Sequence, residues 1–254
     1  MYFSKKFDEF HNIKHCFFSK NGGVSKDIYS SLNCGIGSND KKNNVQNNLA
    51  IVSKKIGVST NGLFLMNQTH SNKVVIIDEE NQNIQRINAD ALITKIKNIA
   101  ISVLTADCVP ILIYEEVNQV VACVHAGWRG AINGIIKKTL REVINMGKNN
   151  KIYVVVGPCI GVKNYEVGKE FYNEFIRENK KNDIFFFHNQ KDKFLFDLRS
   201  YVNFKIKEFD IEYLENIDFN TYTEKEKFFS FRRSRQLGEK DYGRCISTIG
   251  LTDV

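Results

Sequence analysis

Proline and cysteine are both scarce in this sequence. Only two of its 254 residues are proline, Pro110 and Pro158, and neither a Pro-rich or Gly/Ser-rich linker nor an internal repeat divides the chain. We therefore expect one catalytic domain spanning residues 1–254, a length that a single large domain commonly fills. The six cysteines include no Cys-x-x-Cys pair, which excludes the usual spacing of a structural zinc site and argues against disulfides.

Long apolar runs are also absent. No stretch approaches the roughly 18 apolar residues that a membrane-spanning helix needs. Asp8 and Glu9 follow the basic N-terminus before an apolar segment can form, so we expect no signal peptide and a cytoplasmic protein. Because neither GxGxxG nor GxxxxGK[ST] occurs, nothing favours a Rossmann or P-loop nucleotide site.

The charge balance favours anionic partners. Lysine and arginine number 36 against 29 acidic residues, a formal net charge of +7, which suits phosphate or nucleotides. The basic residues are dispersed, and many lie in Asn-rich stretches such as 40–48, as on a solvated surface. We therefore do not expect nucleic-acid binding, and we expect a monomer or a weak homodimer.

Short β-branched, apolar runs alternate irregularly with helical patterns. Over residues 131–146 apolar side chains recur at spacings of three and four and end at Gly147, which predicts an amphipathic helix. Because the order is not a regular βαβ series, we expect an α+β fold of mixed sheets layered with helices. The other expected helices are 45–56, 167–178 and 198–209, and the expected strands are 73–78, 89–94, 100–104, 111–115, 119–124, 152–156 and 228–231.

Two of the five histidines and one cysteine stand at the ends of expected strands. His70 precedes one strand, His125 closes another, and Cys108 lies two residues before Pro110, where a strand ends. One thiolate with two imidazoles is a sound zinc ligand set, and three protein ligands leave a position for water, as in catalytic sites. We interpret the trio as a candidate catalytic zinc site.

The same residues permit other interpretations. Cys108 could be a thiolate nucleophile with His70 or His125 as its base and Asp107 orienting the pair, as in a cysteine hydrolase. All three could equally be structural, as strand-end histidines and a buried thiol. Their separation in the sequence matches no local metal motif, so the alternatives stay open at this point.

Nearby arginines are candidates for binding an anion. Arg129 stands at the expected start of a helix, where a guanidinium and free backbone amides would both face a phosphate. Arg232 and Arg233 follow an aromatic segment containing Phe229, which could stack a base while the arginines bind phosphate. A strand followed by a solvated loop explains this segment equally well.

Five short motifs follow one another in a specific order: Gln68–Ser71 (QTHS), Thr105–Cys108 (TADC), His125–Gly130 (HAGWRG), Gly157–Ile160 (GPCI) and Phe228–Arg233 (FFSFRR). Together they resemble the YfiH family, which is described both as purine nucleoside phosphorylase and as multicopper polyphenol oxidase (laccase). Gly22–Ser25 and Ser31–Asn33 match as well, so the resemblance covers nearly the whole chain.

The resemblance implies a layered α-β-β-α sandwich with one zinc ion per chain on His70, Cys108 and His125. It also implies phosphorolysis of adenosine, inosine, guanosine and S-methyl-5′-thioadenosine to free base and ribose 1-phosphate, with adenosine deaminase as a second activity. For these reactions we expect Asp107 to shuttle a proton. The expected phosphate and substrate ligands are Arg129, Arg232, Arg233 and Phe229.

The laccase description demands more ligands than the chain has. A full multicopper oxidase needs on the order of ten histidines, many in His-x-His pairs. This chain has five and no such pair. A single copper ion in the trio stays an alternative to zinc, as do a copper-dependent polyphenol oxidase and a nucleotide- or nucleic-acid-binding module without turnover.

Three positions depart from the family pattern. Asn48 stands where the family usually has arginine, and the segment around Tyr222 lacks a cysteine that the family often carries. The loop Ser234–Tyr242 is longer than the common pattern, although Gly243 and Arg244 close it as expected. These departures bear on substrate preference more than on the metal.

Overall fold

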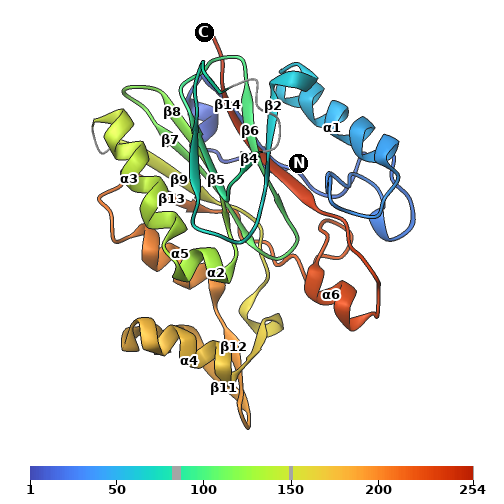
Figure 1. The fold of residues 1–254 in the computed structure, drawn as a ribbon, viewed down its shortest axis with the longest axis vertical. Helices are drawn as coiled ribbons and strands as arrows, with labels where there is room; N and C mark the ends of the chain where they lie inside the picture. Colours follow the sequence, from blue (N-terminus) through green and yellow to red (C-terminus); the bar gives the residue numbers. More distant parts are fainter. Residues whose placement is uncertain (82–86, 149–150, 254) are drawn as a thin grey trace.

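Two mixed β-sheets lie face to face, with helices on their outer faces and a smaller lobe at one end (Figure 1). The computed structural model describes residues 1–81, 87–148 and 151–253. One sheet has the strand order β1-β14-β6-β2-β4, and the other has the order β13-β9-β7-β8-β5-β3. The expected α-β-β-α sandwich with mixed sheets is confirmed.

The five-stranded sheet draws its strands from both ends of the chain. β14 lies between β1 and β6 and is antiparallel to both, while β2 runs parallel to β6. The strands are β1 (Ile13–Phe17), β2 (Leu63–Asn67), β4 (Ile87–Asn88), β6 (Ala100–Thr105) and β14 (Cys245–Leu251).

The six-stranded sheet is buried on both faces at its centre. Its β-branched and apolar residues suit this position, because every residue of β5, β7, β8 and β9 is buried. The strands are β3 (Val74–Ile77), β5 (Ala91–Thr94), β7 (Val109–Glu115), β8 (Val120–Ala126), β9 (Ile152–Val156) and β13 (Tyr213–Asn216).

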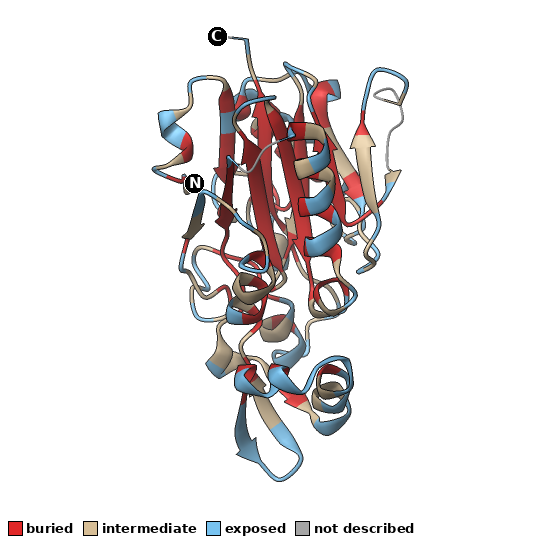
Figure 2. Cartoon of the chain, turned by 90° about the vertical axis from the view of Figure 1, so that its left-hand side faces the viewer, coloured by how far each residue is buried: buried red, intermediate tan, exposed pale blue. Residues whose placement is uncertain are grey.

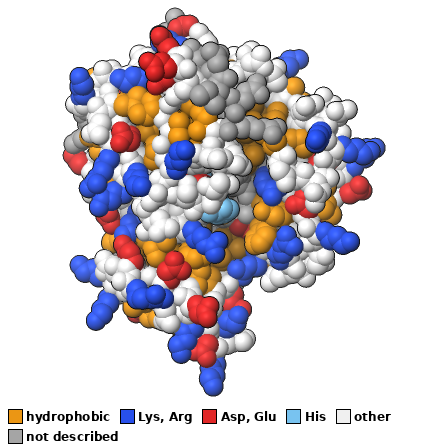
Figure 3. Space-filling view, viewed as in Figure 1, with side chains coloured by type: hydrophobic (Ala, Val, Ile, Leu, Met, Phe, Trp, Pro, Cys, Tyr) orange, Lys and Arg blue, Asp and Glu red, His pale blue; other side chains and the backbone are white. Residues whose placement is uncertain are grey.

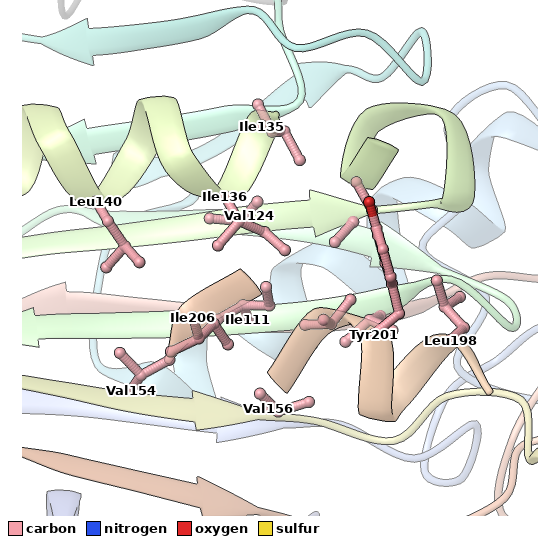
Figure 4. Close-up of a cluster of buried hydrophobic side chains, with 14 of the residues drawn as sticks. Ile111, Val124, Ile135, Ile136, Leu140, Val154, Val156, Leu198, Tyr201 and Ile206 are labelled. Atoms are coloured by element: carbon pink, nitrogen blue, oxygen red, sulfur yellow. The ribbon is translucent and has the colours of Figure 1, made fainter. Parts of the chain in front are cut away.

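Helices cover the outer face of each sheet. α1 (Lys42–Ile56) buries Val52 and Ile56 in one apolar cluster with residues of the five-stranded sheet. α3 (Ile135–Gly147) and α5 (Leu198–Ile206) cover the six-stranded sheet. Figure 4 shows Ile135, Ile136, Leu140 and Ile206 of these two helices packed onto Ile111, Val124 and Val154 of β7, β8 and β9.

The main core lies between the two sheets. Ile101, Val103 and Ile249 of the five-stranded sheet pack in one cluster with Leu112 and Val121 of the six-stranded sheet. The central strands of the two sheets are almost entirely buried, whereas the lobe is largely exposed (Figure 2). The strand ends that lead toward the lobe are therefore held by a rigid core.

The lobe is built from a three-stranded sheet and one helix. β12 (Lys193–Phe196) lies between β10 (Glu166–Gly168) and β11 (Phe186–Gln190), next to α4 (Lys169–Glu178). Aromatic rings form its interior, with the Phe175 and Phe196 ring centroids 4.7 Å apart. No strand was expected at β11 or β12, because neither sequence alternates between apolar and polar residues.

Two expectations about secondary structure were wrong. The helix expected over 131–146 is two helices, α2 (Trp128–Ile132) and α3, because Gly134 takes a left-handed conformation at φ 84°. Residues 228–231 form no strand, because the Ser230 hydroxyl accepts the amide of Arg233 and caps α6 (Phe231–Gln236). The segment therefore turns into a helix.

The other expected elements are present, the strand over 152–156 with the same bounds and the rest with shifted ones. The helix expected from residue 45 begins at Lys42, the one expected from 167 begins at Lys169, and the one expected to reach 209 ends at Ile206. Among the described residues no helix is both long and apolar enough to cross a membrane. Short 3-10 segments lie at Phe7–Glu9, Asp27–Tyr29, Thr60–Gly62, Val162–Asn164 and Lys180–Phe185.

Candidate metal centre and active site

His70, Cys108 and His125 converge at one end of the sandwich. His70 lies between β2 and β3, Cys108 lies between β6 and β7, and His125 is the penultimate residue of β8. Their ligand atoms all lie within 4.8 Å of one another, and Sγ of Cys108 is 3.8 Å from Nε2 of His70. The two sheets thus bring together three side chains that are far apart in the sequence.

The surroundings of the trio fit a metal ion. A Cβ atom at Gly127 would lie 2.8 Å from Cδ2 of His70 and 3.1 Å from Sγ of Cys108, so a side chain there would displace the ligands. Two imidazoles and a thiolate suit zinc, and among the described residues no fourth His, Cys or carboxylate joins the cluster. The donor set is therefore that of an open site.

Asp90, directly before β5, accepts hydrogen bonds from both histidines of the trio. Its Oδ1 atom lies 2.8 Å from Nδ1 of His125, and its carboxylate has no solvent exposure. Burial acts to raise the pKa of Asp90, but the hydrogen bonds from His125 and Ser71 outweigh it and lower the pKa to about 2. Asp90 is therefore a buried anion in contact with both histidines.

Cys108 and His125 influence each other's protonation. Burial acts to raise the pKa of the Cys108 thiol, but the neighbouring His125 lowers it below its usual value. Burial acts to lower the pKa of His125, but the charge of Cys108 and the bond to Asp90 raise it. Without a metal, the two side chains favour a thiolate and imidazolium pair.

A cavity of about 890 Å³ opens at the trio. Its walls come from both sheets, from α2 and α6, and from the lobe. Figure 3 shows a histidine in a hollow on this face, with basic side chains around it. Besides the trio, the polar and aromatic side chains that line the cavity are Asn67, Gln68, Asp107, Trp128, Arg129, Tyr165, Glu166, Phe171, Phe231, Arg232, Tyr242 and Arg244.

Three arginines face this cavity. The guanidinium of Arg129 lies 4.8 Å from the Trp128 ring, and that of Arg232 lies 5.3 Å from the Tyr165 ring. Within the part of the chain that the structure describes, neither guanidinium forms a hydrogen bond or an ion pair. Both therefore keep their donors for an anion, and Arg244 adds a third positive charge.

Asp107 also lines the cavity, yet its carboxylate is occupied by the protein. It accepts the hydroxyls of Thr221 and Ser230 at 2.7 and 2.9 Å and the backbone amide of Arg232 at 2.7 Å. Burial raises the pKa of Asp107, although these hydrogen bonds act to lower it. This geometry suits a residue that holds α6 in place better than one that exchanges protons with a substrate.

Arg233 and Phe229 do not reach the cavity. The guanidinium of Arg233 donates to the carbonyls of Thr221, Tyr222 and Phe228 at 2.8, 2.7 and 2.6 Å. Phe229 is buried in a separate apolar cluster and does not line the cavity. The geometry therefore gives no support to the expected contacts of these two side chains with phosphate or a base.

The departures from the family pattern do not involve the trio itself. Asn48 is fully buried in α1, where its amide nitrogen donates to Ser25, Ser31 and Asn33. Thr221, in the segment without the cysteine, donates to Asp107. The first residues of the long loop form the end of α6, whose first turn presents Arg232 to the cavity.

Sequence reasoning did not single out three residues of the site. Asp90 had one available signal, since it is an acidic residue inside the otherwise apolar start of the strand expected over 89–94. Arg244 was noted only as the end of a loop, and Tyr165 follows a turn with no distinguishing pattern. Only the fold shows that Tyr165 and Arg244 face the trio's cavity.

Known proteins with similar sequences cover most of this chain. The family model described as multi-copper polyphenol oxidoreductase laccase matches residues 14–252. A purine nucleoside phosphorylase of Rickettsia conorii is 36% identical over 214 residues, which are 82% of this chain and 88% of that protein. The purine nucleoside phosphorylase YfiH of Escherichia coli is 31% identical over 239 residues, 94% of each protein.

Solved structures share the whole architecture. The hypothetical protein YfiH of Bacillus licheniformis superposes with a TM-score of 0.88 at 27% identity, covering 94% of this chain and 93% of that one. A Neisseria meningitidis protein superposes with a TM-score of 0.85 at 29% identity, covering 96% of each chain. By its sequence, its fold and its ordered motifs, the chain belongs to the YfiH family.

Proposed function

We propose that this protein is a purine nucleoside phosphorylase that converts a nucleoside and phosphate to the free base and ribose 1-phosphate. The observation that carries the proposal is the cavity in which the His70, Cys108 and His125 trio meets three arginines and several aromatic rings. The relatives from Rickettsia conorii and Escherichia coli, both named purine nucleoside phosphorylases, support it.

Arg129 and Arg232 are suited to bind the attacking phosphate. Each presents a planar fork of N–H donors that matches phosphate oxygens, and each is supported by an aromatic ring on one face. Asp107 and the Ser230 cap hold the first turn of α6, so Arg232 is held at the cavity wall. Prealigned cations of this kind bind an anion with little reorganisation.

The aromatic walls suit the purine. Phe231 and Tyr242 pack edge to face with their ring centroids 5.1 Å apart, and Tyr165 and Phe171 line the cavity on the lobe. A base can stack on such rings whatever its exocyclic groups, because every base has a π face. The volume falls in the usual range for small-molecule sites, roughly 300–1,000 Å³. Adenosine, inosine, guanosine and S-methyl-5′-thioadenosine are therefore the proposed substrates.

We propose that His70, Cys108 and His125 hold one zinc ion per chain. Zinc would supply Lewis acidity, which an adenosine deaminase uses to activate water, and this is the basis for proposing that second activity. The deep position of His125 and the more exposed position of His70 leave the open side of the trio toward the cavity. Asp107 acts in this proposal as the positioning residue of Arg232.

Copper oxidation is not supported by the ligands present. The trio is the one cluster of three or more possible ligands among the described residues, and of the other histidines His15 is buried and His188 lies in the lobe. A single copper ion could occupy the trio, but a mononuclear site plus a trinuclear cluster could not form. The relatives' names also favour the phosphorylase over a cysteine hydrolase or a binding module.

Incubation of the zinc-loaded protein with adenosine and phosphate tests the proposal. We expect ribose 1-phosphate in an amount equal to the sum of adenine and hypoxanthine, and neither base without phosphate. The deaminase activity should appear as inosine or hypoxanthine. Elemental analysis should find zinc near one per chain, lost in the H70A, C108A and H125A variants. If a folded, zinc-loaded protein releases no base from any of the four nucleosides, the phosphorylase assignment is wrong.

A further inference from the structure

One buried carboxylate touches both histidine ligands of the proposed metal site. We propose that Asp90 is the positioning residue of this site: it holds the His125 ring and the His70 backbone in ligand geometry before a metal binds. The inference rests on the proposed metal site, but it does not depend on the substrate or on turnover.

The contact with His125 determines which ring nitrogen remains for a metal. Oδ1 of Asp90 accepts a hydrogen bond from Nδ1 of His125 at 2.8 Å, so Nδ1 carries a proton and Nε2 is left as the ligand atom. The backbone amide of His125 also donates to the Asp90 carbonyl at 2.8 Å. Ring and backbone of His125 are therefore both tied to the same residue.

The His70 loop wraps around the same carboxylate. Three consecutive amides donate to it: Thr69 at 3.2 Å, His70 at 3.0 Å and Ser71 at 2.7 Å. The hydroxyl of Ser71 adds a bond of 2.7 Å, and that of Thr69 adds one of 3.3 Å. Such a ring of backbone N–H groups is a favourable setting for an anion, which here belongs to the protein itself.

The backbone of His70 needs this support. Its φ is 56°, in the left-handed region that costs residues other than glycine about 1 kcal/mol or more. The hydrogen bonds that the amides of Thr69, His70 and Ser71 donate to Asp90 hold this conformation. Without the carboxylate, the loop would be free to relax and carry the ligand away from Cys108 and His125.

Asp107 is the matched comparison within the same site. It is also a buried aspartate and directly precedes the ligand Cys108, but its partners are Thr221, Ser230 and the amide of Arg232. No histidine of the trio hydrogen-bonds to it in the described structure. Comparing the two Asp→Asn variants therefore distinguishes a loss of contact with the histidines, which only D90N suffers, from the loss of a buried negative charge, which both suffer.

The experiment compares the zinc affinity of the D90N and D107N variants with that of the unmodified protein by competition with a chelator. We expect D90N to bind zinc roughly 10- to 100-fold more weakly, as for other residues that orient metal ligands, and D107N to stay within about threefold. Cobalt-loaded D90N should also show a weakened thiolate charge-transfer band. Unchanged affinity in D90N, an equal loss in D107N, or no tight zinc binding by the unmodified protein would overturn the inference.

Two further measurements serve if D90N does not fold. The S71A variant removes the hydrogen bond from the Ser71 hydroxyl to Asp90 and keeps the contact between Asp90 and His125. We therefore expect a loss of about three- to tenfold in zinc affinity. In the unmodified zinc-loaded protein, long-range proton–nitrogen NMR should show Nδ1 of His125 protonated and Nε2 bound to metal. The opposite assignment, or S71A with unchanged affinity, contradicts the proposed role of Asp90. These measurements need no turnover, so they stay informative if the phosphorylase assignment fails.

Discussion

At the residue scale, the site depends on polar side chains that the protein holds by many hydrogen bonds. Asp90 accepts hydrogen bonds from His125 and from the backbone amide of His70, and Asp107, next to Cys108, accepts one from the first turn of α6. Within the described residues, the guanidinium of Arg232 faces the cavity without a hydrogen bond or ion pair to the protein. The arrangement separates residues that hold the site from residues that can bind a substrate.

Arg232 should therefore be needed for phosphate. We expect the R232Q variant to lose roughly 100-fold in kcat/KM, the effect typical of removing one oriented donor, mainly through a higher KM for phosphate. Initial rates at varied phosphate, with adenosine saturating, measure this effect. R235Q is the matched control, because Arg235 lies on the same helix but does not line the cavity. Similar losses in both variants would contradict the assignment.

The lowered pKa of His15 predicts how the free energy of unfolding depends on pH. Burial lowers its pKa from 6.5 to about 4, and its Nε2 atom accepts the amide of Ser4. As the pH falls below 6.5 the unfolded chain takes up a proton that the folded chain does not, so the free energy of unfolding falls. The contribution is fully present above pH 6.5, and about 3 kcal/mol of it is lost by pH 4.

Denaturant unfolding at several pH values measures this contribution. Relative to the unmodified protein, H15Q should be less sensitive to pH between 6.5 and 4, because glutamine can accept the Ser4 amide but does not titrate. The H11Q variant is the control, since His11 is exposed. Equal pH profiles for the unmodified protein and H15Q would show that His15 is not responsible.

At the scale of elements, the break between α2 and α3 determines where Arg129 lies. Gly134 at φ 84° ends α2 and begins α3 in a new direction, so Arg129 belongs to a short helix beside the trio. The periodicity of the segment extends across the break and predicts one continuous helix. The left-handed glycine is the physical reason that the helix is interrupted.

Replacing this glycine should strain the backbone and nothing else. A Cβ at Gly134 would meet no atom within 4 Å, so G134A should destabilise the fold by about 1 kcal/mol through its positive φ alone. Chemical denaturation monitored by circular dichroism measures the change. G37A is the control, because Gly37 is also unobstructed but has no positive φ. A G134A protein as stable as G37A would contradict this explanation.

At the scale of the whole molecule, stability comes from the apolar layer between the sheets. The ion pairs are mostly between exposed side chains, which contribute little each, whereas the inter-sheet cluster is buried from solvent. The site lies at the end of this layer, on strand ends and on the loops between strands. The rigid core can thus hold loops with strained residues such as His70.

Substitution of Leu112 tests whether the apolar layer between the sheets stabilises the fold. It is fully buried on β7, and we expect L112A to lower the free energy of unfolding by about 2–5 kcal/mol through lost burial and the cavity left behind. V117A should change it by less than about 0.5 kcal/mol, because Val117 is 59% exposed. Thermal and denaturant unfolding measure both. Equal effects of the two substitutions would contradict the assignment of the core.

Much of the fold could be predicted from the sequence because its evidence is local. Apolar patterns within one window predict the strand Ile152–Val156, most of α1 and most of α3, although not the break before α3. His70, Cys108 and His125 were also accessible, because ligand types at strand ends can be recognised in the sequence and the ordered motifs match a known family. What the sequence determined by itself was therefore the local elements and the chemistry of the ligands.

The tertiary structure decided which distant groups meet. β14 pairs with β1 across almost the whole chain, Asp90 contacts His125, and Arg244 lines the same cavity as Ile36 and Asn67. Residues 228–231 are no strand because Ser230 and Asp107, far apart in the sequence, share the cap of α6. Hydrogen bonds between residues so far apart in the sequence depend on how the sheets pack, so they cannot be predicted from the pattern of neighbouring residues.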